Sequence, residues 1–240
     1  AVYKAALEAM PGKAITFRTM DIGGDKPVEA LGLEQEQNAF LGYRAIRICL
    51  DRPELFLTQL RALLRASAFG KVQIMFPMIA TLEELRRAKA YVAQAKEQLA
   101  QKGQAFDPNT PVGMMVEVPA AAVLARQFAR EADFFSIGSN DLTQYTMAAD
   151  RMNPKVEHLS NPMDPAVLTL IAQTIQAAKQ AGIPCSVCGE LAGMAEAVPV
   201  LLGLGLEKFS VSPGKLLAVR RAIAECSEVE AQQAARRALS

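Results

Sequence analysis

Short apolar segments alternate with amphipathic segments along nearly the whole 240-residue chain. The apolar segments are rich in Val, Ile, Met and Phe without polar alternation, which is typical of parallel strands buried on both faces. We predict strands over 14–21, 42–48, 72–79, 112–119, 134–137, 183–190 and 206–212, although the second segment also fits a helix. Between most of these strands, helical periodicity begins at cap signals such as Asp51–Pro53 and Thr81–Glu84. This alternation predicts an α/β fold, a (β/α)8 TIM barrel lacking its first strand, with a doubly wound open sheet as the alternative.

The chain opens inside a helical pattern, Ala1–Met10, with no capping residue before it. We therefore expect the sequence to be a fragment of a longer polypeptide. Its 240 residues are long enough to bury a sizeable core. We treat 1–240 as one barrel domain that is truncated at its amino end.

Charge and cysteine content exclude several classes of protein. The net charge is +1, and the 26 basic and 25 acidic residues are interspersed, so no nucleic-acid or membrane surface is indicated. The apolar stretches are too short to span a bilayer. Four cysteines in a chain of this length do not make a disulfide framework. We expect a cytoplasmic protein with reduced thiols that contacts neither nucleic acid nor membrane.

A polar cluster follows the buried segment Phe134–Ile137 directly. Gly138 ends the apolar run, and the sequence Ser-Asn-Asp follows, with Arg151 ten residues after Asp141. An Asx turn would account for the Asn-Asp pair alone. It would not account for Arg151 or for polar residues at the ends of other strands. We therefore interpret this stretch as part of a binding site at the carboxyl edge of the sheet.

Polar or reactive side chains lie at, or just after, the carboxyl ends of the predicted strands. They are Arg18, Arg44, Glu117, Asn140, Asp141, Arg151 and Cys188. In a barrel these ends converge on one mouth. Glu117 and Asp141 offer oxygen ligands to Mg²⁺, which binds one or two carboxylates and takes its other ligands from substrate and water. The arginines match carboxylate or phosphate groups, so we predict a small, highly anionic, metal-chelated substrate.

Several of these residues have simpler explanations. Arg44, with Arg47 nearby, could be ordinary surface charge, and Glu117 could be a buried partner for an arginine. Cys185 and Cys188 form a C-x-x-C pattern, which also suits a redox or zinc site. With no second cysteine pair and a single histidine, His158, four zinc ligands are hard to assemble. We interpret His158 as a loop or capping residue.

Several motifs in order resemble the PEP-utilising enzymes. The segment DFFSIGSNDLTQYTMAADR is similar to the family signature, and FRTMDIGGDK, FLGYRAIRI, RASAFGKVQIMFPMI, GMMVEVPAA and CGELAG follow the same pattern. Together they resemble the C-terminal PEP-binding domain of the enzyme I family of the sugar phosphotransferase system, the phosphoenolpyruvate-protein phosphotransferases. The resemblance implies a TIM barrel that forms a homodimer. It also implies Mg²⁺-dependent phosphoryl transfer from PEP to a histidine on another domain, with release of pyruvate.

The resemblance assigns a role to each strand-end residue. It implies that Arg18, Arg44 and Arg151 bind the phosphate and carboxylate of PEP and that Asn140 contacts the phosphate. Glu117 and Asp141 are implied to hold Mg²⁺, and Cys188 is implied to protonate the enolpyruvate carbon.

Three departures from the family pattern bear on these expectations. The first barrel strand, with its PEP-binding arginine, has no counterpart here, and neither has the N-terminal domain that carries the acceptor histidine and meets the phosphocarrier protein. Met194 also replaces an acidic residue after CGELAG. We therefore expect the chain alone to bind PEP weakly or not at all, and to be inactive in transfer.

Two other classes of function stay open at this point. The absent first strand would also suit a degenerate barrel kept as a dimerisation or regulatory module. The segment GMMVEVPAA alone would suit a metal-dependent lyase acting on 2-oxo acids. A dikinase-type or PEP-synthase-type PEP domain is a further alternative, although DIGGDK and CGELAG favour enzyme I.

Overall fold

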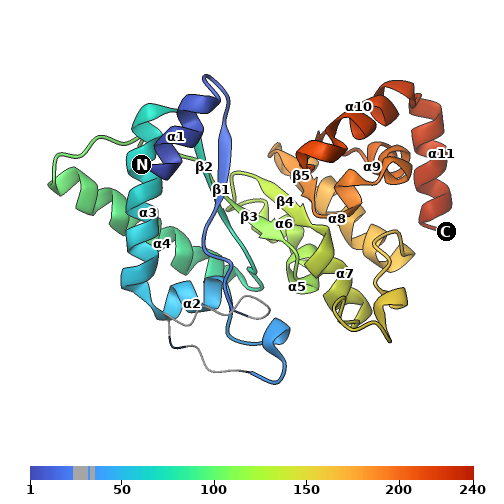
Figure 1. The fold of residues 1–240 in the computed structure, drawn as a ribbon, viewed down its shortest axis with the longest axis horizontal. Helices are drawn as coiled ribbons and strands as arrows, with labels where there is room; N and C mark the ends of the chain where they lie inside the picture. Colours follow the sequence, from blue (N-terminus) through green and yellow to red (C-terminus); the bar gives the residue numbers. More distant parts are fainter. Residues whose placement is uncertain (24–31, 33–35) are drawn as a thin grey trace. The chain divides into compact units, whose positions relative to one another are not determined.

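Parallel strands joined by helices make up the fold of the computed structural model, which describes residues 1–23, 32 and 36–240 (Figure 1). The chain divides into two compact units, Ala1–Met114 and Met115–Ser240, and the boundary falls within β3 (Val112–Val116). Each strand follows the previous one along the sheet, β1-β2-β3 in the first unit and β4-β5-β6 in the second. The predicted α/β class of barrel type is confirmed, because the order of the strands follows the order of the sequence.

The first unit packs helices against β1 and β2. Phe56 of α3 meets Phe76 of β2 and Tyr91 of α4 edge-to-face, with ring centroids 5.8 and 5.7 Å apart. The helices α3 and α4 lie side by side (Figure 1). The elements of this unit are α1 (Val2–Ala9), β1 (Ile15–Arg18), η2 (Ala39–Leu41), α2 (Ile46–Asp51), α3 (Pro53–Ala66), η3 (Ser67–Phe69), β2 (Val72–Phe76) and α4 (Leu82–Gln101).

The second unit surrounds β4, β5 and β6 with helices, and its last helices, α9, α10 and α11, gather at the carboxyl end of the chain (Figure 1). Its strands are β4 (Phe135–Gly138), β5 (Cys185–Cys188) and β6 (Lys208–Phe209). Its α-helices are α5 (Pro119–Val123), α6 (Ala125–Phe128), α7 (Ser139–Met147), α8 (Pro165–Ala181), α9 (Val198–Gly203), α10 (Leu216–Glu225) and α11 (Glu228–Ala238). Its 3-10 turns are η4 (Glu157–Leu159), η5 (Leu191–Gly193), η6 (Ala195–Ala197) and η7 (Pro213–Lys215).

Side chains in the local sequence set the starts of the long helices. The Thr81 hydroxyl accepts the Glu84 backbone N–H, and the Glu84 carboxylate accepts the Thr81 N–H in return, which confirms the predicted capping box of α4. Asp164 accepts the Ala166 N–H ahead of the proline that begins α8. These caps satisfy backbone N–H groups that have no partner within the helix, so the local sequence determines the residues at which α4 and α8 begin.

The strand predicted over 42–48 is wrong. Residues Ile46–Asp51 form helix α2, whose Ile46, Ile48, Cys49 and Leu50 are all buried. A short helix buried on most sides produces the same apolar run as a buried strand, so periodicity could not separate them. The strand predicted over 206–212 is shorter in the structure, where β6 comprises only Lys208–Phe209. Of the predicted glycine-rich loop 21–26, the structure describes residues 21–23, and the rest lies outside the described residues.

Among the helices that the structure describes, none is both long and apolar enough to cross a lipid bilayer.

Candidate active site

The junction between β4 and α7 carries the polar cluster expected from the sequence. β4 ends at Gly138 and α7 begins at Ser139, so no loop intervenes. Asp141 therefore lies in the first turn of α7, close to the unpaired backbone N–H groups and the positive end of the helix dipole. This placement stabilises a carboxylate that is only 7% exposed.

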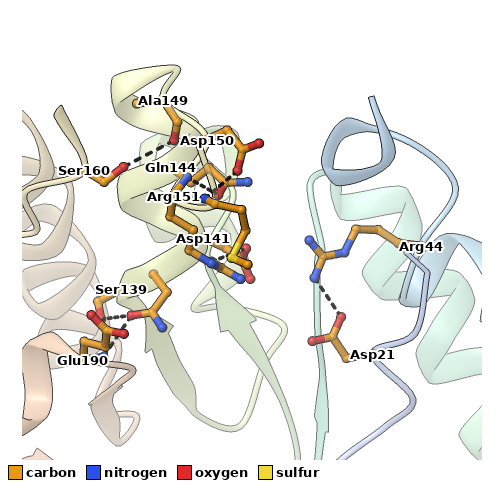
Figure 2. Close-up of polar contacts among 12 residues, drawn as sticks. Asp21, Arg44, Ser139, Asp141, Gln144, Ala149, Asp150, Arg151, Ser160 and Glu190 are labelled. Atoms are coloured by element: carbon orange, nitrogen blue, oxygen red, sulfur yellow. Dashed lines mark hydrogen bonds and ion pairs between the residues drawn. The ribbon is translucent and has the colours of Figure 1, made fainter. Parts of the chain in front are cut away.

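Asp141 holds the guanidinium of Arg151. Arg151 Nη1 donates to Asp141 Oδ1 at 3.0 Å, and the backbone N–H of Arg151 donates to Gln144 Oε1 at 3.2 Å (Figure 2). Ala148 ends α7 in the left-handed conformation, with φ of 51°, which turns the chain back so that Arg151 reaches the start of its own helix. The structure thus brings together the two residues that the sequence analysis connected.

Glu117 follows β3 and is 1% exposed. A Cβ added to Gly138 would lie 2.7 Å from Glu117 Oε2 and 2.9 Å from Glu117 Cβ. The Glu117 carboxylate therefore rests against the backbone of Gly138, three residues before Asp141. Both predicted metal ligands belong to the second unit, Glu117 packed against Gly138 at the end of β4 and Asp141 in the first turn of α7.

Gly138 leaves the space that Glu117 fills, so Gly138→Ala should force this buried side chain to move. We expect the free energy of unfolding to fall by about 1–3 kcal/mol, the usual cost of overpacking a buried site. Denaturant unfolding followed by circular dichroism measures it. Gly214→Ala is the matched control, because an added Cβ there meets nothing within 4 Å. Equal stability of Gly138→Ala and the control would contradict the close packing of Glu117.

Cys188 ends β5 opposite Gly138, its register partner on β4. Its thiol lies beside the same strand, because Sγ is 3.4 Å from the Ile137 carbonyl oxygen and 3.6 Å from Ser136 Oγ. The Ser136 hydroxyl can donate to the sulfur, and the thiol can donate to the carbonyl. The Cys188 thiol is thus held next to the β4–α7 junction.

Two side chains of α7 tie the turn after β5 to this junction. Ser139 Oγ donates to the Cys188 carbonyl oxygen at 2.8 Å, and Asn140 Oδ1 accepts the Glu190 backbone N–H at 2.9 Å. Gly189, with φ of 85°, makes this approach possible, because a Cβ there would lie 2.4 Å from Ser139 Oγ. Since Asn140 uses its carbonyl oxygen in this contact, its amide nitrogen is the group that suits an anionic ligand.

In the first unit, Arg18 and Arg44 converge on one carboxylate. Arg18 Nη1 is 3.0 Å from Asp21 Oδ2, and Arg44 Nη2 is 3.1 Å from Asp21 Oδ1. The Arg44 side chain is 1% exposed, so the alternative that it is ordinary surface charge is wrong. The sequence analysis did not select Asp21, although its position three residues after Arg18 at a strand end could have indicated it.

Residues 1–228 match the model of the family described as "PEP-utilising enzyme, PEP-binding domain". The chain belongs to this family. Over 99% of its length it is 54% identical to the phosphoenolpyruvate-protein phosphotransferase of Bacillus subtilis, and 53% identical to that of Staphylococcus carnosus. It spans 42% and 41% of those proteins, which is less than half of their length.

Solved structures agree on the fold alone. A citrate lyase from Burkholderia xenovorans matches 75% of this chain and 56% of its own, with a TM-score of 0.55 and 18% identity. A malate synthase from Haloferax volcanii matches 72% and 52%, with a TM-score of 0.54 and 14% identity. At such low identity, the activities of these proteins say nothing about this PEP-binding domain.

The two cysteines of the C-x-x-C pattern belong to one short strand of this PEP-binding domain. Cys185 and Cys188 lie at opposite ends of β5, and both are free thiols. Burial raises the pKa of Cys185 to about 12, so that thiol stays protonated. Within residues 1–23, 32 and 36–240, no three side chains of the His, Cys, Asp or Glu type gather as a zinc site would require. His158 lies exposed in η4, as a loop residue.

Proposed function

We propose that this chain is the PEP-binding domain of a phosphoenolpyruvate-protein phosphotransferase. Such an enzyme transfers the phosphoryl group of PEP to a histidine on another domain and releases pyruvate. The family match over residues 1–228, together with 54% identity to a relative of that name, carries the proposal. The likeness to a citrate lyase does not favour a lyase, because it is one of fold at 18% identity.

The donor set fits Mg²⁺. Glu117 and Asp141 supply carboxylate oxygens from neighbouring segments, and a site with two protein carboxylates leaves positions for substrate oxygens and water, as Mg²⁺ prefers. A buried carboxylate such as Glu117 is costly without a cation nearby. When bound, Mg²⁺ would neutralise charge on the phosphoryl group.

The arginines would bind the anionic ends of PEP. Arg18, Arg44 and Arg151 each present a planar fork that can meet a phosphate or carboxylate with two hydrogen bonds. Asp141 orients Arg151, and the Asn140 amide nitrogen would donate to a phosphate oxygen. Phosphoryl transfer would then rest on positioning and charge neutralisation rather than on covalent chemistry by the protein.

Cys188 would act as the general acid. After the phosphoryl group leaves, enolpyruvate needs one proton at its methylene carbon to become pyruvate. The thiol gives that proton and becomes a thiolate, which the Ser136 hydroxyl can stabilise as a hydrogen-bond donor before solvent returns a proton to sulfur. The assignment fits a thiol placed at a strand end beside the proposed metal ligands.

The proposed partners follow from the same family. We expect PEP and pyruvate as ligands, a phosphocarrier protein that meets the enzyme through other domains, and a second copy of the chain in a homodimer. The four free thiols suit the cytoplasm.

Calorimetric titration of the intact protein with PEP, with and without Mg²⁺, tests the proposal. We expect saturable PEP binding that needs Mg²⁺. If PEP shows no Mg²⁺-dependent binding, the proposed function is wrong. Conversion of 2-oxo acids to pyruvate without any phosphoryl acceptor would instead indicate a lyase.

A further inference from the structure

Asp21 joins two arginines that come from different parts of the first unit. Each of its carboxylate oxygens meets one guanidinium, Oδ2 with Arg18 at 3.0 Å and Oδ1 with Arg44 at 3.1 Å. Figure 2 shows Asp21 and Arg44 pointing toward each other. Arg18 ends β1, whereas Arg44 lies just before α2, so the carboxylate connects these two elements through side chains.

This cluster is buried to different depths. The Asp21 and Arg44 side chains are 4% and 1% exposed, but Arg18 is 39% exposed. Of the two guanidinium groups, that of Arg18 is therefore the one accessible to solvent. The adjacent Cys49 adds no charge, because burial, together with the negative charge of Asp21, raises its pKa to about 12.

Backbone contacts next to Asp21 fix the position of its carboxylate. The Ala45 N–H donates to the Ile22 carbonyl oxygen at 2.9 Å, which ties the segment after β1 to the segment that carries Arg44. A Cβ on Gly23 would lie 2.8 Å from the Tyr43 carbonyl oxygen, so the two backbones are in direct contact. Ala45 itself has φ of 51° and ψ of −122°, a conformation that costs energy for a residue with a Cβ and persists only where its surroundings enforce it.

We propose that Asp21 is a positioning residue that sets the spacing and orientation of the Arg18 and Arg44 guanidinium groups for PEP. This inference rests on the proposed function, in which those two arginines bind an anion. Asp21 is not itself a ligand for PEP, because a carboxylate repels an anionic substrate. The two effects have opposite signs: loss of the charge alone would tighten PEP binding, and loss of the arrangement would weaken it.

Two variants of the intact protein separate these effects. Asp21→Asn keeps the shape but removes the charge and one acceptor oxygen. Asp21→Glu keeps the charge, so that buried Arg44 stays paired, but moves the carboxylate by one methylene group. We expect the dissociation constant for PEP, measured by calorimetry with Mg²⁺, to rise at least about tenfold in both, because small misplacements of binding groups are costly. Asp51→Asn is the control, since it removes an exposed carboxylate that accepts from Tyr43 and touches neither arginine.

Denaturant unfolding of each variant is measured alongside. A merely structural role of Asp21 would lower stability and leave the dissociation constant of the folded protein unchanged, which would overturn the inference. Unchanged or tighter PEP binding in Asp21→Asn would overturn it as well, while leaving the proposed function in place. If Asp21→Asn does not fold, Asp21→Glu decides, and wild-type affinity in that variant rejects the inference. Absence of PEP binding in the wild-type protein would instead reject the proposed function, and this inference with it.

Discussion

Replacing Glu117 by Gln is expected to abolish Mg²⁺-dependent binding of PEP. Gln has the same shape as Glu, and the site is closed around this side chain, which is 1% exposed and rests against Gly138. The substitution therefore removes the negative charge with little change in packing. Because loss of groups that merely support metal ligands costs about 10–100-fold in metal affinity, loss of a direct ligand should cost at least about 100-fold.

Asp141→Asn should have a similar effect with an additional component. Asp141 is also the ion-pair partner of Arg151, at 3.0 Å, so the Asn variant weakens the hold on a proposed PEP-binding guanidinium. Calorimetric titration of PEP at several Mg²⁺ concentrations separates the loss of a metal ligand from the displacement of Arg151. A metal ligand shifts the Mg²⁺ concentration needed for half-maximal binding, whereas a displaced arginine weakens binding even at saturating Mg²⁺.

Glu190→Gln provides the control for charge. Glu190 lies two residues after Cys188 and is exposed, and its backbone N–H, rather than its carboxylate, contacts Asn140. Removing its charge should leave the Mg²⁺ dependence unchanged. If Glu117→Gln binds PEP and Mg²⁺ like the wild-type protein, Glu117 is a structural carboxylate and the proposed metal site is wrong.

The sequence was sufficient to predict the elements where local signals and burial agree. The continuous apolar runs that end at Phe76 and Val116 form β2 and β3, and α4 begins at the predicted Thr81–Glu84 capping box. The polar cluster after Gly138 also follows a buried strand, as the pattern predicted. Because β4 runs straight into α7, the side chains at this junction have little conformational freedom. Local chemistry determines such junctions.

Other parts of the molecule depend on contacts between distant segments, which periodicity does not contain. Helix α2 was predicted as a strand because nearly all its residues are buried, and its start depends on the unusual backbone of Ala45. The role of Asp21 likewise depends on Arg44, 23 residues away in sequence. A carboxylate and an arginine at that separation give no signal until the fold brings them together.

The same distinction applies to the site residues. The ion pair of Asp141 and Arg151 lies within one helix and the turn that follows it, and the sequence analysis placed both residues in one stretch without predicting that they pair. The contact of Glu117 with Gly138 joins the segment after β3 to the end of β4. In the sequence, a glycine at position 138 is the one trace of this contact, because a residue with a Cβ would not fit there. Sequence reasoning therefore named Gly138 as the end of a strand but not as the residue that makes room for Glu117.

Cys188→Ala is expected to leave PEP binding intact and to block the formation of pyruvate. The proposed general acid contributes to the step that follows phosphoryl transfer, so removing the thiol should not weaken the grip of the arginines or of the metal ligands on PEP. A positioned general acid typically accelerates proton transfer by about 10²–10⁴-fold, and we expect the rate of pyruvate release to fall by a factor in that range. Coupled assay of pyruvate release and calorimetry of PEP binding measure the two effects on the same preparation.

Cys185→Ala is the matched control, since it removes a second thiol from the same strand. Cys185 lies at the opposite end of β5, and its pKa of about 12 keeps it protonated. Its loss should leave the rate of pyruvate release unchanged. If Cys188→Ala loses PEP binding as well as turnover, the thiol is needed for packing against Ser136 and Ile137 rather than for proton transfer. Because the two cysteines share one strand, a difference between these variants reflects the different surroundings of the two thiols along β5.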